Sequence, residues 1–354
     1  MKKTTISSLT LLPICFLSFA CMHCPDGESA CNPASSADRI RDWRQLEYGM
    51  FIHYGLSTFV GDDMANGDDP ASAYAPTHLD VEQWVRTAKD AGMKYIVLTS
   101  KHVSGFCIWD SKVQWQGKAY DYDVAAGKDT TDVIAAFIEA CRQYDIWPGI
   151  YYCTMDLRNS LRDIEWYPKL PALSPDYYAL MKDHLTELHT AHPDIAIQWL
   201  DIPRHLTNAQ RVELYTLVRS LNPDCLVMFN YGKESSDIKG PFTVEKARNV
   251  TWPTDILNSE VTPIREPFQT QQTVQGRTYE LGYEHCVSMV DKWFWKKDET
   301  LKSVAELVDI YQQTRRLNGN LLLNVPPDNT GRIPQATITR LMELRQVLDQ
   351  MNHD

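Results

Sequence analysis

Short apolar runs alternate with amphipathic segments along most of this 354-residue chain. The short runs are rich in β-branched and aromatic residues, which is typical of buried strands. They lie at 49–53, 94–100, 147–152, 195–201, 225–230 and 320–325. The longer segments have apolar residues at helical spacing, which predicts helices. These lie at 81–91, 131–144, 176–191, 209–221, 303–317 and 334–351. Strands that alternate with helices of this length indicate a parallel sheet covered by helices.

The number of these elements favours a single barrel over a doubly wound sheet. A dinucleotide-binding sheet would have a Gly-rich GxGxxG turn after its first strand, and the sequence has none there. These six strands and roughly 315 residues of folded chain suit one barrel. The sequence therefore predicts an α/β fold, a (β/α)8 TIM-like barrel over residues 38–354. The stretch 232–300 is polar and rich in Pro, Gly and Trp, so we expect a long loop on the active face.

The first residues have the pattern of an export signal. Lys2 and Lys3 precede an apolar stretch that ends in a small residue before Cys21, which predicts a signal peptide at 1–21. The five residues ending at Cys21 resemble a bacterial lipoprotein cleavage box, with the leucine one position too far from the cysteine. Residues 22–37 are small and polar, so we expect a flexible tether. The expected location is the periplasm or the outer membrane of a bacterium, with a possible lipid anchor at Cys21.

The amino-acid composition disfavours some classes of binding partner. The formal net charge of -11 disfavours nucleic acid or an anionic membrane surface. Ten Trp and seventeen Tyr are many for this length, and aromatic faces stack on sugars, although most of them fill cores. The cysteines of the body stand singly, with no CxxC pair, so we expect buried free thiols and no zinc ribbon. They are Cys107, Cys141, Cys153, Cys225 and Cys286.

Candidate chemistry begins with Asp201, at the end of the apolar run 196–201. The C-terminal ends of barrel strands form the catalytic face, so a buried strand would deliver this carboxylate to it. The alternative is an Asp that caps the next helix or starts a turn, which is the commoner fate. Other strands also end in hydrogen-bonding residues, at 53–54, 101–102, 151–152 and 230–231. Together these strand ends predict a polar pocket with an acid in it.

The sequence lacks the motifs of a metal site and of a serine nucleophile. His53 and His102 have no metal-binding spacing, and each alone could be a core histidine. No Gly-x-Ser-x-Gly elbow for a serine nucleophile is present. Two carboxylates that act on a glycosidic bond need no cofactor. We therefore expect no metal, no cofactor, and a glycan or oligosaccharide as the substrate.

Several segments resemble the α-L-fucosidases of glycoside hydrolase family 29. Residues 49–55 (GMFIHYG) resemble the motif G-[IM]-F-[IL]-H-[WY]-G, and residues 98–109 (LTSKHVSGFCIW) resemble L-T-x-K-H-H-D-G-F-x-x-W. Residues 199–202 (WLDI) resemble W-F-D-G, whose Asp is the family nucleophile. Further similar segments lie at 252–260, 283–286 and 318–327. Family members often carry a C-terminal β-sandwich, which we do not expect in this chain.

The resemblance implies a retaining exo-α-L-fucosidase. Asp201 would attack the anomeric carbon to form a covalent fucosyl intermediate, and a second carboxylic acid would protonate the leaving oxygen and then activate water. The position of this acid/base varies within the family. The candidates are Glu260, which we choose, and Glu284; Glu266 and Glu234 are more typical of solvated loop charges.

Seven residues are expected to contact the sugar, from the same resemblance: His53, Tyr54, His102, Tyr152, Trp199, Trp293 and Trp295. The two histidines match family histidines that bind fucose hydroxyls, and Trp199 matches an aromatic beside the nucleophile. Trp293 and Trp295 fall where family members place an aromatic against the C6 methyl of fucose, and an aromatic wall suits the methyl group of a 6-deoxy sugar.

Three departures from the family pattern concern sugar recognition. The His-Asp pair that follows His102 in the family is Val103-Ser104, the Glu-Trp pair after the first strand is Asp63-Met64, and an Arg is missing after the fifth strand. The reaction would be kept while the contacts that select the sugar change. A substituted fucoside or an α-galactoside-like sugar is therefore an alternative substrate. A glycan-binding protein without catalysis is the second alternative, because fold alone does not establish function.

Overall fold

The computed structural model describes residues 33–160, 172–230, 245, 248, 251–274 and 276–351. The expected signal peptide with Cys21 and most of the expected tether lie outside these residues, as does Glu234.

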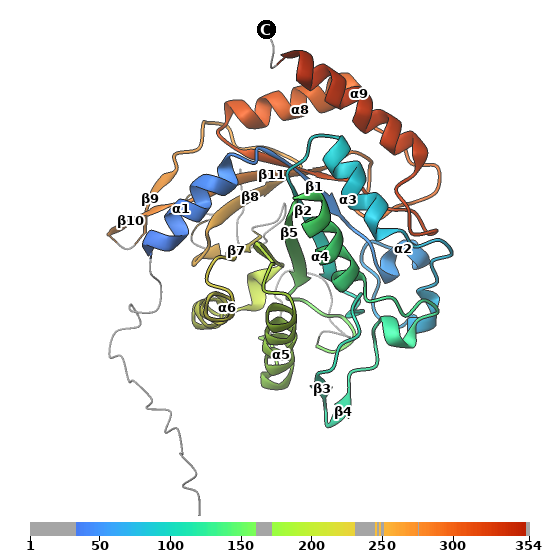
Figure 1. Ribbon diagram of the computed structural model, residues 1–354. Coiled ribbons are helices and arrows are strands. Elements are labelled where there is room, and N and C mark those ends of the chain that lie inside the picture. Colours follow the sequence, from blue (N-terminus) through green and yellow to red (C-terminus); the bar gives the residue numbers. More distant parts are fainter. Residues whose placement is uncertain are drawn as a thin grey trace, which may run out of the picture. The chain divides into compact units, whose positions relative to one another are not determined.

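Eight parallel strands form a nearly closed barrel (Figure 1). They are β1 (Tyr48–Ile52), β2 (Tyr95–Lys101), β5 (Trp147–Cys153), β6 (Ile197–Asp201), β7 (Leu226–Phe229), β8 (Ile256–Glu260), β11 (Gly282–Ser288) and β12 (Asn320–Asn324). Their hydrogen-bonded order is β7-β6-β5-β2-β1-β12-β11-β8, with every pair parallel. The Asp255 N–H donates to the Val227 carbonyl at 2.8 Å and so links the start of β8 to β7. The predicted (β/α)8 barrel is confirmed.

Helices surround the barrel, as Figure 1 shows. They are α1 (Pro33–Arg44), α2 (Leu56–Val60), α3 (Val81–Asp90), α4 (Val133–Tyr144), α5 (Pro175–Ala191), α6 (Asn208–Leu221), α8 (Val304–Arg316) and α9 (Gln335–Met351). Side-chain caps define several of their starts: Ser174, Thr207 and Ser303 each accept the N–H three residues on. Thr207 and Ser303 complete capping boxes with Gln210 and Glu306. Among the residues described, no helix is both long and apolar enough to cross a membrane.

Short elements lie in the loops that connect the barrel strands and helices. Three 3-10 turns lie at η1 (Ala71–Ala73), η2 (Val124–Ala126) and η3 (Pro203–His205). Two antiparallel hairpins are formed by β3 (Gln114–Trp115) with β4 (Lys118–Ala119) and by β9 (Gln271–Val274) with β10 (Arg277–Glu280). In the described part of the connection between β8 and β11, this second hairpin takes the place of a helix.

Strand alternation separates an inner core from an outer one. Phe51 and Trp199 belong to the apolar cluster inside the barrel, whereas Met50 and Leu200, their chain neighbours, pack outward under the helices. Helix α1 adds Trp43 to the inner cluster, where the indole is fully buried and contacts the Tyr95 ring at 6.1 Å. Since α1 begins at Pro33, residues 33–37 are helical, and the predicted tether over 22–37 extends too far at its C-terminal end.

The prediction of loop over 232–300 is wrong at two places, because β8 and β11 are barrel strands. Their sequences, ILNSE and GYEHCVS, are half polar. Asn258 and Glu284, their inward side chains, bond to each other inside the barrel, so these strands lack the continuous apolar run by which a buried strand is recognised.

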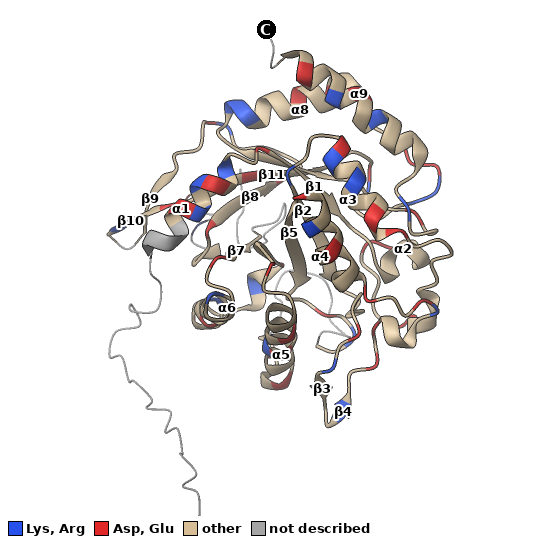
Figure 2. Cartoon of the chain, in the orientation of Figure 1, with Lys and Arg blue, Asp and Glu red and all other residues tan. Residues whose placement is uncertain are grey.

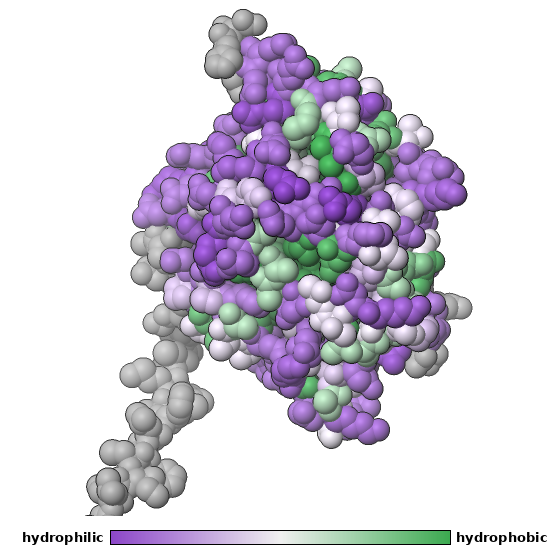
Figure 3. Space-filling view, turned by 45° about the vertical axis from the view of Figure 1, so that its right-hand side comes forward, coloured by the Kyte–Doolittle hydropathy of each residue, from purple (hydrophilic) through white to green (hydrophobic). Residues whose placement is uncertain are grey.

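The cysteines of the body agree with expectation. All five body cysteines are buried free thiols, as predicted. Acidic and basic residues are interspersed along the outer helices and loops (Figure 2), and the face in Figure 3 is mostly hydrophilic with several hydrophobic areas. No C-terminal β-sandwich is present among the described residues, where α9 is the last element.

Candidate active site

Asp201 is the last residue of β6 and points into the barrel mouth, on the same side of the strand as Trp199. The Tyr151 hydroxyl donates to its Oδ2 at 2.6 Å, and the Asn230 side-chain amide and the Ile202 N–H donate to its Oδ1, each at 2.8 Å. Burial raises the pKa of Asp201, while these three hydrogen bonds act in the opposite direction. Three donors fix both oxygens of the carboxylate, which is the requirement for a group that must attack along one direction.

Glu260 ends β8 and lies beside Asp201. The Asn230 Nδ2 atom, just after β7, donates to Asp201 Oδ1 at 2.8 Å and to Glu260 Oε1 at 2.9 Å. Two oxygens bound to one nitrogen at these distances are no more than 5.7 Å apart. Three consecutive strands thus bring two carboxylates and one amide together at the C-terminal face of the barrel.

Glu284, the alternative acid/base, lies one layer deeper. It pairs in register with Asn258, two residues before Glu260, so it is roughly 6–7 Å farther down the barrel. Tyr95 OH, Trp199 Nε1 and Asn258 Nδ2 all donate to its carboxylate at 2.9–3.1 Å. Burial raises the pKa of Glu284 to about 7. A carboxyl enclosed by three partners and 1% exposed is placed to organise the barrel interior and not to reach a ligand at the mouth.

His53 and His102 meet at the mouth of the barrel, and both rings lie beside the Tyr151 ring. Their ring centroids are 5.9 Å apart, and each lies within 5.8 Å of the Tyr151 ring. Burial lowers the pKa of His53 to about 3 and that of His102 well below its ordinary value, so both rings are neutral at pH 7. His102 Nδ1 is buried and has no hydrogen-bond partner among the described residues. The predicted pairing of these histidines in one site fits the geometry.

The aromatic wall is made by Trp293 and by its neighbour Phe294, which sequence reasoning missed. The Trp293 ring lies 5.1 Å from His53, and the Phe294 ring lies 5.2 Å from His53 and 5.0 Å from His102. Trp295 makes no ring contact with either histidine in the part of the chain that is described. The family resemblance pointed to the two Trp residues that flank Phe294 and not to Phe294 itself.

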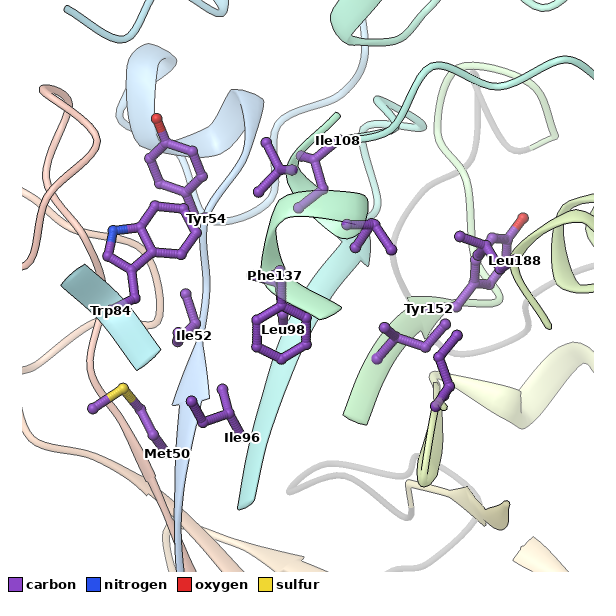
Figure 4. Packing of buried hydrophobic residues seen from close by; sticks show 14 of the residues in the cluster. Met50, Ile52, Tyr54, Trp84, Ile96, Leu98, Ile108, Phe137, Tyr152 and Leu188 are labelled. Atoms are coloured by element: carbon purple, nitrogen blue, oxygen red, sulfur yellow. The ribbon is translucent and has the colours of Figure 1, made fainter. Parts of the chain in front are cut away.

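Tyr54 and Tyr152 do not belong to the site, and these two predictions are wrong. Tyr54 packs outward against Trp84 at 4.9 Å under the helices (Figure 4). The Tyr152 hydroxyl is hydrogen-bonded to His184 of α5 at 2.9 Å. Successive side chains of a strand point to opposite faces, so the inward neighbours His53 and Tyr151 occupy the site instead. The two-residue period from Phe51 selects His53 over Tyr54, whereas the choice of Tyr151 over Tyr152 depends on the register that pairs Tyr151 with Trp199.

Trp199 forms the floor of the site. It is 1% exposed, stacks on Tyr151 with 5.6 Å between centroids, and packs on Phe51 at 5.1 Å. Its Nε1 donates to Glu284 below. It therefore supports the other residues of the site from beneath.

Two of the positions that departed from the family pattern have structural roles. Both carboxylate oxygens of Asp63 accept backbone N–H groups, from Trp293 at 3.3 Å and from Phe294 at 3.4 Å. Val103 is fully buried in the inner apolar cluster. Asp63 thus holds the aromatic wall, and Val103 offers no hydrogen bond where the family has a histidine.

Both carboxylates are followed by a β-branched residue in the left-handed backbone region. The φ angle is 53° at Ile202 and 60° at Val261, and such residues cost about 1–3 kcal/mol there. The left-handed turn aims the Ile202 N–H at Asp201, and a bond from the Thr262 N–H to the Glu260 carbonyl (2.5 Å) closes the turn around Val261. The chain turns sharply after each carboxylate at a cost in backbone strain, which is typical of functional sites.

A (β/α)8 barrel with two carboxylates at the C-terminal ends of its strands defines the class of barrel glycoside hydrolases. Within this class, the chain belongs to the α-L-fucosidase family, whose model matches residues 65–352.

Relatives and solved structures agree with this membership. Alpha-L-fucosidase 1 of Arabidopsis thaliana is 27% identical over 322 residues, which cover 89% of this chain and 60% of that protein. The chain thus spans less than two thirds of the length of the first curated relatives it matches. A structure from Bacteroides thetaiotaomicron, assigned as an α-L-fucosidase, is 27% identical with a TM-score of 0.72 and covers 88% of this chain and 67% of that one. An α-L-fucosidase of Lactobacillus casei, 24% identical, shares the fold over its whole length and 90% of this chain, with a TM-score of 0.70.

Proposed function

We propose that this protein is a retaining exo-α-L-fucosidase in which Asp201 is the nucleophile and Glu260 is the acid/base. The observation that carries the proposal is the Asn230 amide bound to both carboxylates, which limits the two bound oxygens to a separation of 5.7 Å. Retaining glycosidases have their carboxyl groups roughly 5–5.5 Å apart, whereas inverting enzymes need roughly 6.5–9.5 Å to admit a water molecule. Family membership supports fucose as the sugar.

In the first step, an Asp201 oxygen attacks the anomeric carbon while the bond to the leaving oxygen breaks. The Glu260 carboxyl donates its proton to that oxygen, so the aglycone leaves as a neutral alcohol and Glu260 becomes a carboxylate. The sugar is then held as an ester of Asp201. Tyr151 and Asn230 orient the attacking group through their hydrogen bonds to its two oxygens.

In the second step, Glu260 takes a proton from water, and the water oxygen attacks the anomeric carbon. The ester bond breaks, Asp201 leaves as a carboxylate, and fucose is released with its original anomeric configuration. Two carboxylates this close disfavour a doubly charged state, so the pair with one proton is the working resting form.

The test is release of nitrophenolate from 4-nitrophenyl α-L-fucopyranoside by the chain from residue 22 onward. We expect turnover in the wild type and a loss of at least about 10⁴-fold in Asp201→Asn, with fucose binding retained in calorimetry. Tyr152→Phe is the matched control, since it removes a hydroxyl from the same barrel outside the site. Fucose binding without turnover of any α-linked sugar by the wild type would instead favour the glycan-binding alternative.

A substituted fucoside or an α-galactoside-like sugar is the second candidate substrate, and Val103 is the observation that favours it. This fully buried apolar residue stands where the family has a histidine, so one hydroxyl contact is lacking. Rates on aryl α-L-fucoside and aryl α-galactoside, compared in the wild type and in Val103→His, distinguish the candidates. Higher fucoside activity in the wild type than on any other sugar would contradict altered specificity.

We also propose that the protein is exported and that Cys21 carries a lipid. The charged, apolar and small-residue order of 1–21 supports export. In a bacterial host, the full chain should incorporate labelled palmitate and fractionate with membranes, and Cys21→Ser should do neither. A soluble, unlabelled wild-type protein outside the cytoplasm would leave export standing and contradict lipidation.

A further inference from the structure

Asn324, the last residue of β12, connects a site histidine to the aromatic wall. It is fully buried. Its Oδ1 lies 2.8 Å from His53 Nδ1, and its Nδ2 donates to the Trp293 carbonyl at 2.8 Å and to Ser288 Oγ at 3.0 Å. One side chain thus joins β1, β12 and the segment after β11.

Donor and acceptor chemistry fixes the orientation of this amide. The Trp293 carbonyl can only accept, so the Asn324 atom facing it must be the NH2 group. Asn324 Oδ1 therefore faces His53, and because an amide oxygen only accepts, His53 Nδ1 must carry the hydrogen. The ring is neutral, since burial lowers the pKa of His53 to about 3. His53 Nε2 is then a lone-pair acceptor.

This tautomer has a consequence for recognition. In water a histidine side chain exchanges freely between two neutral tautomers and a cation, and it can act as a donor or as an acceptor. Held with the hydrogen on Nδ1, His53 can only accept a hydrogen bond through Nε2, as from a sugar hydroxyl.

The Asn324 amide also holds the backbone of Trp293, which forms part of the aromatic wall. The Trp293 backbone is held on both sides, its N–H by Asp63 at 3.3 Å and its carbonyl by Asn324 at 2.8 Å. The Trp293 ring lies beside the His53 ring at 5.1 Å, with 32° between the planes. A shift of Asn324 would therefore move the hydroxyl acceptor and the apolar wall together.

We propose that Asn324 is a positioning residue that locks His53 as an Nδ1–H hydroxyl acceptor and fixes Trp293 beside it, so that the polar and apolar contacts to one sugar keep a set spacing. The identity of the sugar rests on the proposed function; the tautomer and the loop geometry do not.

The first experiment is ¹⁵N NMR of the full chain with labelled histidine at neutral pH, with the His53 signals assigned by loss in His53→Gln. We expect the Nδ1–H tautomer in the wild type and a change to the Nε2–H tautomer or a mixture in Asn324→Ala. Asn320→Ala is the matched control: the same residue type on the same strand, equally buried, with its amide bonded to the Trp43 carbonyl at the other end of the barrel. A wild-type Nε2–H tautomer, or an unchanged His53 signal in Asn324→Ala, would overturn the proposal.

The second experiment separates positioning from general loss of stability. One or two lost hydrogen bonds predict a KM for aryl α-L-fucoside about 10-fold higher in Asn324→Ala, with a smaller change in kcat. Asp63→Asn should raise KM less and leave the His53 tautomer unchanged. Asn320→Ala should lower the melting temperature comparably without raising KM, and an equal KM rise in that control would reject the positioning role. If the wild type has no fucosidase activity, the NMR result still decides this inference, and only the proposed function fails.

Discussion

Glu260 and Glu284 lie on adjacent strands, two residues apart in register, and have opposite surroundings. Glu260 ends β8 at the partly open mouth, where one amide joins it to Asp201. Glu284 lies in the layer beneath, closed in by Trp199, and is satisfied by three donors. The comparison shows that the depth of a carboxyl in the barrel, and not its nearness in sequence to a family motif, decides whether it can reach a ligand. The deeper carboxyl can only hold the residues around it in place.

The largest expected effect distinguishes the two glutamates directly. On a natural α-fucosyl linkage, Glu260→Gln should lower kcat/KM by about 10²–10⁴-fold, because the leaving oxygen is no longer protonated. Glu284→Gln should stay within about 10-fold of the wild type. Steady-state kinetics on the natural linkage and on the aryl fucoside provide the measurement, and the Glu260→Gln loss should be smaller on the aryl substrate, whose leaving group needs little protonation. A larger loss of kcat/KM in Glu284→Gln than in Glu260→Gln would assign the acid/base role to Glu284.

The deeper glutamate should control the pH dependence of stability. Burial raises the pKa of Glu284 from 4.5 to about 7, so the folded state holds a proton that the unfolded state releases above pH 4.5. The stabilisation is complete below pH 4.5 and is lost as the pH rises to 7, by roughly 3 kcal/mol. The free energy of urea unfolding of the wild type minus that of Glu284→Gln should fall by this amount between pH 4.5 and 8. A difference that does not depend on pH would mean that Glu284 is ionised in the folded state.

The amide between the upper carboxylates should matter next. Asn230→Ala removes hydrogen bonds to both carboxylates and, if these carry the proposed reaction, should lower kcat by about 10–100-fold. Asn222→Ala is the control, because it removes a similarly buried amide whose bonds go to the Pro193 and Ile195 carbonyls. Similar kcat values in Asn230→Ala and the wild type would show that the carboxylates hold their positions unaided.

The smallest effect compares the two faces of one strand. Tyr151→Phe loses the hydrogen bond to Asp201 and should reduce kcat by about 10-fold, whereas Tyr152→Phe loses hydrogen bonds to His184 and Tyr177 on the outer face of the strand. The latter should leave kcat unchanged and lower the free energy of unfolding by about 1 kcal/mol. Equal kcat losses in the two variants would contradict the assignment of inner and outer faces.

The sequence alone determined the alternating elements, the barrel, the buried thiols and the family motifs. These depend on local periodicity and short motifs, which can be recognised in the sequence without knowledge of tertiary contacts. Periodicity also placed Asp201 at a strand end, because an apolar run followed by an acid is itself a local pattern.

The tertiary structure alone decided which residues share the site. β8 and β11 were missed because their inward side chains satisfy one another in a polar barrel layer and so lack an apolar signature. Phe294 and Asn324 became visible only when segments distant in sequence were brought together, and so did the role of Asn230, a predicted strand-end residue, as the amide that bonds to two carboxylates. The choice between Glu260 and Glu284 depends on the depth of each carboxyl along the barrel axis. This depth arises from the strand register, and the neighbouring residues exclude or admit water. None of these can be derived from the sequence, because they depend on contacts between distant segments.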